Sequence, residues 1–207
     1  MTTAKQRCAE QALAYLKEGM ILGVGTGTTS NFFIQGLAPW RTRLEAVVAS
    51  SETTAQKLRA LNMPLVELNH VNGIDLYVDG ADEINEHLQM IKGGGGAATR
   101  EKILASASKQ FICIAELKKS VTLLGKFPIA VEVLPMARSF VAREIVKLGG
   151  HPDYRVGFKT DQGNVVLDCY DLDCTDFLGL EHALNNIPGV VGNGVFAARR
   201  ADLWVHE

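Results

Sequence analysis

Residues 20–30 of the chain are MILGVGTGTTS, a short apolar segment that runs into glycines, threonines and a serine. A brief apolar run bounded by glycine is typical of a buried strand, and glycines allow the tight turn by which such a strand leads into a helix. Apolar residues at positions 32, 33 and 37 then recur at helical spacing. The segment therefore predicts a strand, a glycine loop and a helix, which is the repeating unit of an α/β fold.

The same alternation extends through the first part of the chain. Cys8, Ala9, Ala12, Leu13 and Leu16 share one helical face, which predicts a first helix that ends before Gly19. Further strands are expected at 45–49, 64–68, 76–79 and 111–115, and further helices from a cap at Ser51 to about Leu61 and over 97–107. This pattern predicts a Rossmann-like, largely parallel sheet with helices on both faces.

The pattern changes near residue 127. Strands are expected at 129–134, around 154–158, at 165–168 and near Val190, with helices at 138–148 and 177–187. The segment 161–164, DQGN, is a strong hairpin signal. The order β-α-β-β-α-β predicts a ferredoxin-like α+β unit. We expect this small domain at 127–198, inserted into a Rossmann-like catalytic domain of residues 1–126 and 199–207, with a last strand at 201–205 that returns to the first sheet.

Composition limits the class of protein. The chain has 207 residues, of which 47% are hydrophobic, and a formal net charge of −2, which argues against a general nucleic-acid binder. No apolar run approaches the roughly 18 residues of a membrane span, and charged residues occupy the N-terminal region where a signal peptide would be apolar. We therefore expect a cytoplasmic protein with neither a nucleic-acid nor a membrane partner. Cys113 lies in an apolar run and is expected to pack in the core.

The loop at Gly25-Thr26-Gly27-Thr28-Thr29 suits an anion. Glycine lets backbone N–H groups approach a ligand, the start of a helix adds a favourable dipole, and threonine hydroxyls can donate to phosphate oxygens. A tight turn with hydroxyl caps is the alternative. A dinucleotide fingerprint would need a third glycine where Thr28 or Ser30 stands, and no Walker lysine follows.

An acidic segment ends the strand at 76–79. Asp79 is followed by Gly80, Ala81 and Asp82, at the sheet edge where open α/β folds bind ligands. Neighbouring carboxylates disfavour each other's ionisation, which suits acid–base chemistry near neutral pH. A solvated acidic turn is one alternative. A magnesium site is another, although the spacing does not fit a calcium-type loop, and the histidines show no metal-binding spacing.

A glycine run follows at 92–102, KGGGGAATREK. Glycines that lead into a helix form a nest of backbone donors, and Lys92 in front of them can place a cation beside developing negative charge. Glu101 falls in the first turn of the helix, where complementing the helix dipole is a sufficient role for a glutamate. Together, a phosphate loop, carboxylates, a lysine and a donor nest suit proton abstraction next to a carbonyl, through an enediolate.

Six segments in order are similar to the type A ribose-5-phosphate isomerases. They are GVGTGTT at 23–29, YVDGADEIN at 77–85, IKGGGGAATREK at 91–102, LGKFP at 124–128, VEVLPMA at 131–137 and TDQGN at 160–164. The resemblance implies interconversion of D-ribose 5-phosphate and D-ribulose 5-phosphate in the non-oxidative pentose phosphate pathway, without a cofactor. It also implies a homo-oligomer, a dimer or a tetramer. Because Asp79, Asp82 and the histidines lack metal-ligand spacing, we also expect that no metal is needed.

The resemblance implies a role for each matching residue. Glu101 would be the base that moves a proton between C1 and C2, and Asp79 would assist opening of the sugar ring. The phosphate would be held by Thr26, Gly27, Thr28 and Thr29 with help from Lys5 and Lys119, and the substrate oxygens would lie near Gly80, Ala81, Asp82, Lys92, Gly93, Gly94 and Gly95.

One departure and two rival functions stand beside this interpretation. The run GGGGAAT replaces the three glycines, two alanines and leucine that are frequent in the family, although the distance from Lys92 to Glu101 is unchanged. An amino-sugar-phosphate deaminase would need a histidine in the key segments, where none occurs. A sugar-phosphate sensor would need an output module, for which no segment remains.

Overall fold

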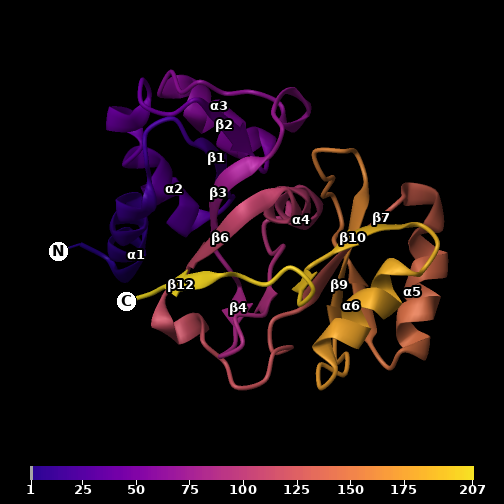
Figure 1. Ribbon diagram of the computed structural model, residues 1–207. Helices are drawn as coiled ribbons and strands as arrows, with labels where there is room; N and C mark the ends of the chain where they lie inside the picture. The colour runs from indigo at the N-terminus through magenta and orange to yellow at the C-terminus, as the bar shows by residue number, and fades with distance from the viewer. Residues whose placement is uncertain (1) are drawn as a thin grey trace. The chain divides into compact units, whose positions relative to one another are not determined.

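The computed structural model describes residues 2–207, which form two compact units (Figure 1). The first comprises the chain through Ala81 together with Ile103–Lys119 and Ala201–Glu207. The second comprises Asp82–Lys102 and Ser120–Arg200. The chain therefore passes between the units at four points, three of them at connections and one inside helix α4, Ala98–Ser106.

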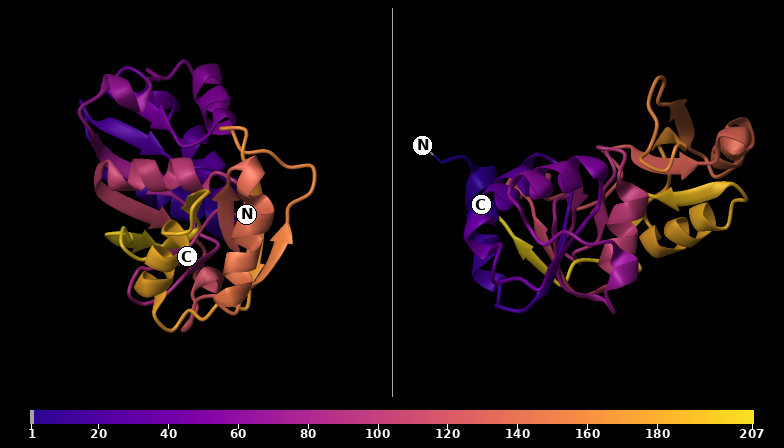
Figure 2. Two further views of the ribbon diagram at one scale, coloured as in Figure 1. Left: turned by 90° about the vertical axis from the view of Figure 1, so that its right-hand side faces the viewer. Right: turned by 90° about the horizontal axis from the view of Figure 1, so that it is seen from above.

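The first unit is built on a five-stranded parallel sheet in the order β12-β6-β3-β1-β2. The strands are β1 Ile21–Val24, β2 Ala46–Ala49, β3 Ile74–Asp79, β6 Ser108–Ile114 and β12 Leu203–Val205. The helices are α1 Ala4–Ala12, α2 Thr28–Gln35 and α3 Glu52–Ala60, with the 3-10 turns η1 Leu13–Tyr15, η2 Ala38–Trp40, η3 Leu68–His70 and η4 Leu117–Lys119. The parallel sheet and the return of the last strand to it are as predicted. Figure 2 shows these elements from two further directions, with the C-terminal strand β12 in yellow.

Capping residues set where the helices of this unit begin. Thr3 and Gln6 form a capping box at the start of α1, which satisfies N–H groups that have no partner inside the helix. Ser51 accepts from the N–H of Thr54 at the start of α3, as its sequence position predicted. Glu52 in the first turn of α3 complements the helix dipole.

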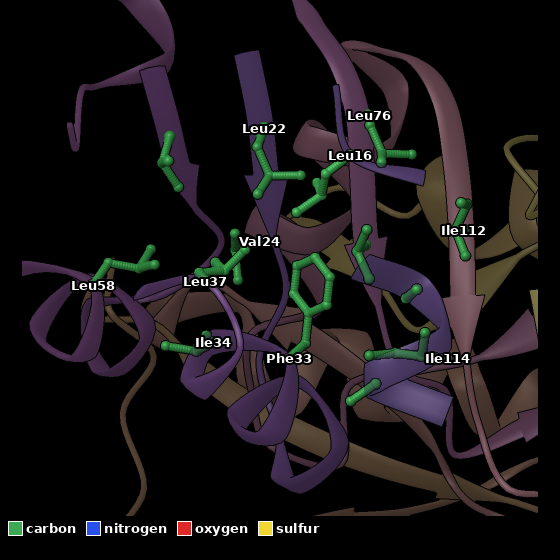
Figure 3. Packing of buried hydrophobic residues seen from close by; sticks show 14 of the residues in the cluster. Leu16, Leu22, Val24, Phe33, Ile34, Leu37, Leu58, Leu76, Ile112 and Ile114 are labelled. Atoms are coloured by element: carbon green, nitrogen blue, oxygen red, sulfur yellow. The ribbon is translucent and has the colours of Figure 1, made fainter. Parts of the chain in front are cut away.

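Helices α1, α2 and α3 pack on one face of the parallel sheet. The ring of Phe33 is fully buried among apolar side chains from neighbouring strands (Figure 3). Burial of each such side chain contributes about 1.5–3 kcal/mol. Cys113 is also fully buried, which confirms its expected core position. The strand residues of this cluster are Leu22, Val24, Val47, Ala49, Leu76, Val78, Ile112, Ile114 and Val205.

The second unit contains the predicted β-α-β-β-α-β order. Its four-stranded antiparallel sheet has the order β10-β7-β9-β8, from β7 Ile129–Val133, β8 His151–Tyr154, β9 Val165–Tyr170 and β10 Val190–Asn193. Helices α5 Arg138–Lys147 and α6 Phe177–Asn185 pack on the same face of it, and η5 Pro135–Ala137 precedes α5. The apolar residues that face these helices alternate along the strands: Ile129, Val131 and Val133 in β7, and Val165, Leu167 and Cys169 in β9.

A second, three-stranded sheet in this unit was not predicted. It has the order β11-β5-β4, from β4 Glu83–Ile84, β5 Met90–Ile91 and β11 Val195–Phe196, all antiparallel. Because β11 pairs with β5, residues 82–102 group with the second unit, which is therefore larger than the expected domain 127–198. The domain limits 1–126 with 199–207 and 127–198 stay a prediction.

Two expected strands are wrong in position. Residues 64–68 make only one parallel bridge, between Leu65 and Val47, because Pro64 offers no N–H and the chain turns into η3. The strand expected at 154–158 lies earlier, at His151–Tyr154, because the chain turns at Gly157, which has φ +74. The turn at 161–164 does form, with Gly163 at φ +81. Among residues 2–207, no helix combines the length and apolar character that a membrane crossing requires.

Candidate active site

The glycine loop of the first unit connects β1 to α2. Gly27 is the N-cap of α2 with φ +123, a conformation that favours glycine, and no side chain caps the helix there. A Cβ at Gly25 would lie 1.9 Å from Oδ1 of Asp79, so only glycine fits. A Cβ at Gly27 would meet no atom within 4 Å. The start of α2 thus has no side-chain cap and has open space at Gly27, two features that suit an anion site.

Lysine and hydroxyl groups complete this loop. Nζ of Lys5, on α1, donates to the hydroxyl of the exposed Thr28 at 2.8 Å, which places a cation at the predicted phosphate loop. The hydroxyl of Thr26 points the other way and lies 2.8 Å from both Ser50 and Ser51 Oγ. Thr26 therefore fixes the loop to the end of β2, while the α2 side of the loop keeps its donors for a ligand.

Asp79 is fully buried and accepts hydrogen bonds from four groups. These are the N–H of Thr26 at 3.0 Å, the hydroxyl of Ser30 at 3.2 Å, the hydroxyl of Tyr77 at 2.5 Å and the N–H of Gly80 at 2.7 Å. Such hydrogen bonds hold a carboxylate rigidly. Asp79 thus joins the end of β3 to the phosphate loop.

The three-stranded sheet of the second unit positions the remaining predicted groups. The N–H of Asp82 donates to the carbonyl of Ile91, and the N–H of Lys92 donates to the carbonyl of Gly194, each at 2.9 Å. These backbone bonds set Asp82 and Lys92 at adjoining ends of β4 and β5. A Cβ at Gly194 would lie 2.1 Å from the carbonyl oxygen of Lys92, so this approach needs glycine.

Lys92 and Glu101 form a buried ion pair. Nζ of Lys92 lies 3.2 Å from Oε2 of Glu101, and their side chains are 3% and 5% exposed. Burying either charge alone would cost several kcal/mol, about 3–5 when the partner is removed. Glu101 lies in the first turn of α4, as predicted, but its carboxylate is turned inward rather than solvated.

The aromatic ring of Phe196 contacts Lys92 and a second lysine, Lys102. The Phe196 ring centroid lies 5.5 Å from Nζ of Lys92 and 4.9 Å from Nζ of Lys102, within the range of cation–π attraction. Lys102 donates to Oε1 of Glu181 and to the carbonyl of Val195, both at 2.5 Å. Burial lowers the pKa of Lys102, and the Glu181 carboxylate opposes part of that shift.

The glycine run makes a tight turn before α4. Gly93 has φ +99 and Gly96 has φ +79, and the N–H of Gly96 donates to the carbonyl of Gly93 at 2.9 Å. The N–H of Gly94 donates to Oδ2 of Asp82 at 2.9 Å. A Cβ at Gly95 would meet no atom within 4 Å. The turn therefore presents Gly95 toward open space.

The structure thus gathers the predicted residues in two sets, each within one unit. Gly80 and Ala81 follow Asp79 in the first unit, and Lys119 is half-buried at the end of η4. The contacts of Gly80, Ala81 and Lys119 with substrate stay predictions. Within the described chain, no group of three or more histidine, cysteine, aspartate or glutamate side chains is arranged to hold a metal ion.

Several residues of both sets were not predicted. Tyr77 could have been found, because residues i and i+2 of a strand lie on the same face, which puts Tyr77 beside Asp79. The Ser50 and Ser51 hydroxyls end a strand next to the loop, but only the capping role of Ser51 was expected. Phe196 lies about a hundred residues from Lys92 in sequence, and no local pattern indicates their contact.

Comparison with known proteins gives consistent matches over nearly the whole chain. The profile of the family described as ribose 5-phosphate isomerase A (phosphoriboisomerase A) matches residues 46–207. Ribose-5-phosphate isomerase A of Legionella pneumophila (strain Corby) is 57% identical over 202 residues, covering 98% of this chain and 94% of the relative.

Solved structures agree with these sequence matches. The crystal structure of ribose 5-phosphate isomerase A from Neisseria gonorrhoeae has a TM-score of 0.96 at 44% identity, covering 100% of this chain and 94% of that one. A D-ribose-5-phosphate isomerase in complex with phospho-erythronic acid has a TM-score of 0.94 at 32% identity, with coverage of 100% and 96%.

Proposed function

Because this chain belongs to the ribose-5-phosphate isomerase A family, we propose that its buried Lys92–Glu101 pair carries out the proton transfer of an aldose–ketose isomerisation. The enzyme interconverts D-ribose 5-phosphate and D-ribulose 5-phosphate. The observation that supports the assignment of residues is a carboxylate paired with an ammonium group beside a glycine turn that is open to a ligand.

In the proposed mechanism, Glu101 removes the C2 proton of the open-chain aldose. The electron pair of the broken C–H bond forms a C1–C2 double bond, and the negative charge moves to O1. The Lys92 ammonium and the turn at Gly93–Gly95, through the N–H of Gly95, stabilise this enediolate, while Asp82 orients the substrate hydroxyls. Glu101 then returns the proton to C1, and the O2 hydroxyl proton passes to O1, which leaves the ketose.

The phosphate would be bound by the loop of the first unit. The N–H groups of Gly27, Thr28 and Thr29 and the hydroxyl groups at the start of α2 suit a dianion, and Lys5 adds a positive charge. Lys119 would add a second. Thr26 is the exception among the predicted phosphate ligands, because both its N–H and its hydroxyl are engaged within the protein. We assign it to shaping the loop.

Asp79 would act where the loop and the sugar ring meet. For it to assist ring opening, a substrate hydroxyl must replace one of its four donors, and the Gly80–Ala81 backbone would lie beside that hydroxyl. The remaining donors would still hold Asp79 and the loop together, so the same residue would serve both tasks.

We further propose a cytoplasmic enzyme that needs neither a cofactor nor a metal and works as a homodimer or homotetramer. The proposal that no metal is needed is supported by Lys92, whose ammonium group would supply the cation at the reacting end. Oligomer size can be measured by light scattering on the purified protein.

The deciding experiment is to incubate the purified enzyme with D-ribose 5-phosphate in heavy water and to follow the sugar by NMR. We expect D-ribulose 5-phosphate to form, with deuterium entering the reacting carbons. Unphosphorylated D-ribose is the matched control and should react far more slowly, because the phosphate supplies binding energy. If D-ribose 5-phosphate were bound but not isomerised, the proposed assignment of residues would be overturned.

A further inference from the structure

Residues 155–158 leave the four-stranded sheet where a strand was expected. The N–H of Arg155 still donates to the carbonyl of Val166, but the N–H of Phe158 turns back to the carbonyl of Arg155, and Gly157 has φ +74. The turn carries the Arg155 and Phe158 side chains to the glycine run that precedes α4.

Arg155 is held rigidly. Its Nε and Nη2 donate to the two oxygens of Asp168 in β9, at 2.8 and 2.5 Å, in the bidentate geometry that gives arginine–carboxylate pairs their directionality. Its guanidinium carbon also lies 5.2 Å from the Phe158 ring centroid. Both groups are about four-fifths buried, so the pair is less screened than a surface salt bridge.

The remaining guanidinium nitrogen of Arg155 reaches the glycine turn. Nη1 donates to the carbonyl oxygen of Gly94 at 3.3 Å. The N–H of Gly94 is bound by Asp82 on its other side. The Phe158 ring lies 2.1 Å from where a Cβ of Gly96 would be, so it packs directly under the turn.

The carbonyl of Gly94 belongs to the same peptide group as the N–H of Gly95. A trans peptide is planar, with C=O and N–H pointing in opposite directions, so a hydrogen bond that fixes the carbonyl also fixes the direction of that N–H. A donor at the carbonyl also polarises the peptide and strengthens the N–H as a donor. The N–H groups of Gly94 and Gly96 are already engaged within the protein, which leaves Gly95 as the central donor for a ligand.

We propose that Arg155, held by Asp168, is a positioning residue that aims the N–H of Gly95 at the oxygen that becomes negative in the reaction. The inference rests on the proposed function of the glycine turn. It assigns a role to two side chains, one directly after β8 and one in β9, that are not among the predicted site residues.

The test compares Arg155→Lys, Arg155→Ala and Asp168→Asn with Arg143→Ala, which removes an exposed arginine of α5. We expect kcat to fall about 10–100-fold in the first three, since losing an aimed donor costs about 10²–10³ and these changes misdirect it rather than remove it. KM should change little, and Arg143→Ala should match the wild type.

Binding measurements separate positioning from stability. The Kd of phospho-erythronic acid, a phosphorylated sugar acid with a charged oxygen pair at the reacting end, should rise in the three variants, while the Kd of inorganic phosphate stays within about twofold. The Gly95 amide proton resonance should also shift, as its peptide loses the hydrogen bond at Gly94.

If Arg155→Ala proves too unstable to purify, Arg155→Lys and Asp168→Asn carry the test. Folded variants with wild-type kcat would overturn the inference, as would a loss of activity matched by an equal loss of inorganic phosphate binding. A wild-type enzyme that fails to isomerise D-ribose 5-phosphate would instead overturn the proposed function, so the two failures are distinguishable.

Discussion

At the scale of single residues, the proposed chemistry depends on the ion pair of Lys92 and Glu101. Both side chains are almost fully buried, so their charges interact much more strongly than in water. In the proposed mechanism the lysine compensates the buried charge of the carboxylate, but it also occupies the carboxylate that has to reach the substrate. Binding of the sugar would resolve this conflict if a substrate oxygen drew the ammonium away from Glu101 as negative charge developed on that oxygen.

Replacing Glu101 by glutamine tests this role directly. Glu101→Gln keeps the size of the side chain but cannot accept a proton, so we expect kcat to fall about 10²–10⁴-fold. Deuterium entry from heavy water at C2 of ribose 5-phosphate should nearly vanish. Binding of the sugar phosphate, measured by calorimetry, should change little, because the phosphate loop lies elsewhere in the chain.

The matched control is Glu52→Gln. Glu52 also lies in the first turn of a helix, α3, and its side chain is about half exposed. It therefore shares the helix-dipole role of Glu101 without the buried lysine partner. Equal effects of the two substitutions, or near wild-type exchange in Glu101→Gln, would return Glu101 to a structural role and make Asp79 or Asp82 the candidate base.

Gly95→Ala probes the open side of the glycine turn. The added methyl group meets no atom within 4 Å, and Gly95 is not among the glycines with positive φ. We therefore expect an unchanged melting temperature but a kcat/KM at least about tenfold lower, because the methyl group would occupy space meant for the substrate.

Gly93→Ala provides the contrast on the same turn. Gly93 has φ +99, and its Cβ would lie 2.8 Å from that of Ala98. This substitution should lower the melting temperature as well as the activity. If Gly95→Ala kept full activity, the substrate would not lie over the turn.

At the scale of elements, Asp75 links three strands of the parallel sheet. In β3, its carboxylate accepts from the N–H of Ile21 in β1 at 2.9 Å and from Nζ of Lys109 in β6 at 2.7 Å. The Lys109 hydrogen bond, followed by that of Ile21, lowers the pKa of Asp75 below its ordinary value of 3.8. The unfolded chain therefore binds more protons than the folded protein between these two pKa values.

This difference gives a testable pH dependence. The stability contributed by Asp75 is fully present above pH 3.8 and is lost as the pH falls through the lower, folded-state pKa. Urea unfolding at a series of pH values should show that Asp75→Asn has a lower free energy of unfolding than the wild type near neutral pH and a shallower decline in acid. Glu10→Gln, an exposed carboxylate of α1, should leave the slope unchanged. Parallel slopes for Asp75→Asn and the wild type would contradict the prediction.

The strand β11 contributes the Phe196 ring that faces Lys92. Phe196→Leu keeps an apolar side chain but removes the ring face, whose attraction for a buried cation is about 0.5–2 kcal/mol. We expect kcat to fall about 3–30-fold, measured as initial rates at saturating substrate. Phe177→Leu, at the start of α6 in the same unit, should leave kcat unchanged. An equal loss in both variants would indicate general core damage instead.

The longer elements could be predicted from the sequence, whereas the three-stranded sheet could not. The strands β1, β3 and β7 have at least four residues and clear flanking signals, so their positions were predicted within a few residues. The strands β4, β5 and β11 have two residues each, too few to show the alternation by which a strand is recognised. Their pairing depends on contacts between distant segments, so the sheet that positions Asp82 and Lys92 was missed.

The same contrast holds for the candidate site. Lys92 and Glu101 could be proposed as site residues because they flank a run of four glycines that leads into a helix, within a segment that matches the family pattern. Their orientation was not predictable, since an inward-facing and a solvated Glu101 have the same local sequence. Arg155 and Asp168 were missed because the fold, rather than any motif, brings them to the glycine turn.

At the scale of the whole molecule, each compact unit has its own apolar cluster, and the candidate residues are divided between the units. Nowhere in residues 2–207 do three or more potential metal-ligating side chains gather. The buried carboxylates that a metal might use are engaged otherwise: Asp79 by four donors and Glu101 by Lys92. A divalent cation would have to displace these partners, and it would then compete with Lys92 for the same enediolate oxygen.

We therefore predict that exhaustive dialysis against EDTA leaves kcat and KM for ribose 5-phosphate within about twofold of their starting values, because in the proposed mechanism the positive charge that stabilises the enediolate comes from a side chain. Lys92→Ala, assayed in parallel, should lose activity that added Mg²⁺ or Zn²⁺ does not restore, since Asp82 and Glu101 alone are too few ligands for either ion. Loss of wild-type activity on dialysis, with recovery on adding either metal, would show that a metal rather than Lys92 carries the charge at the reacting oxygen.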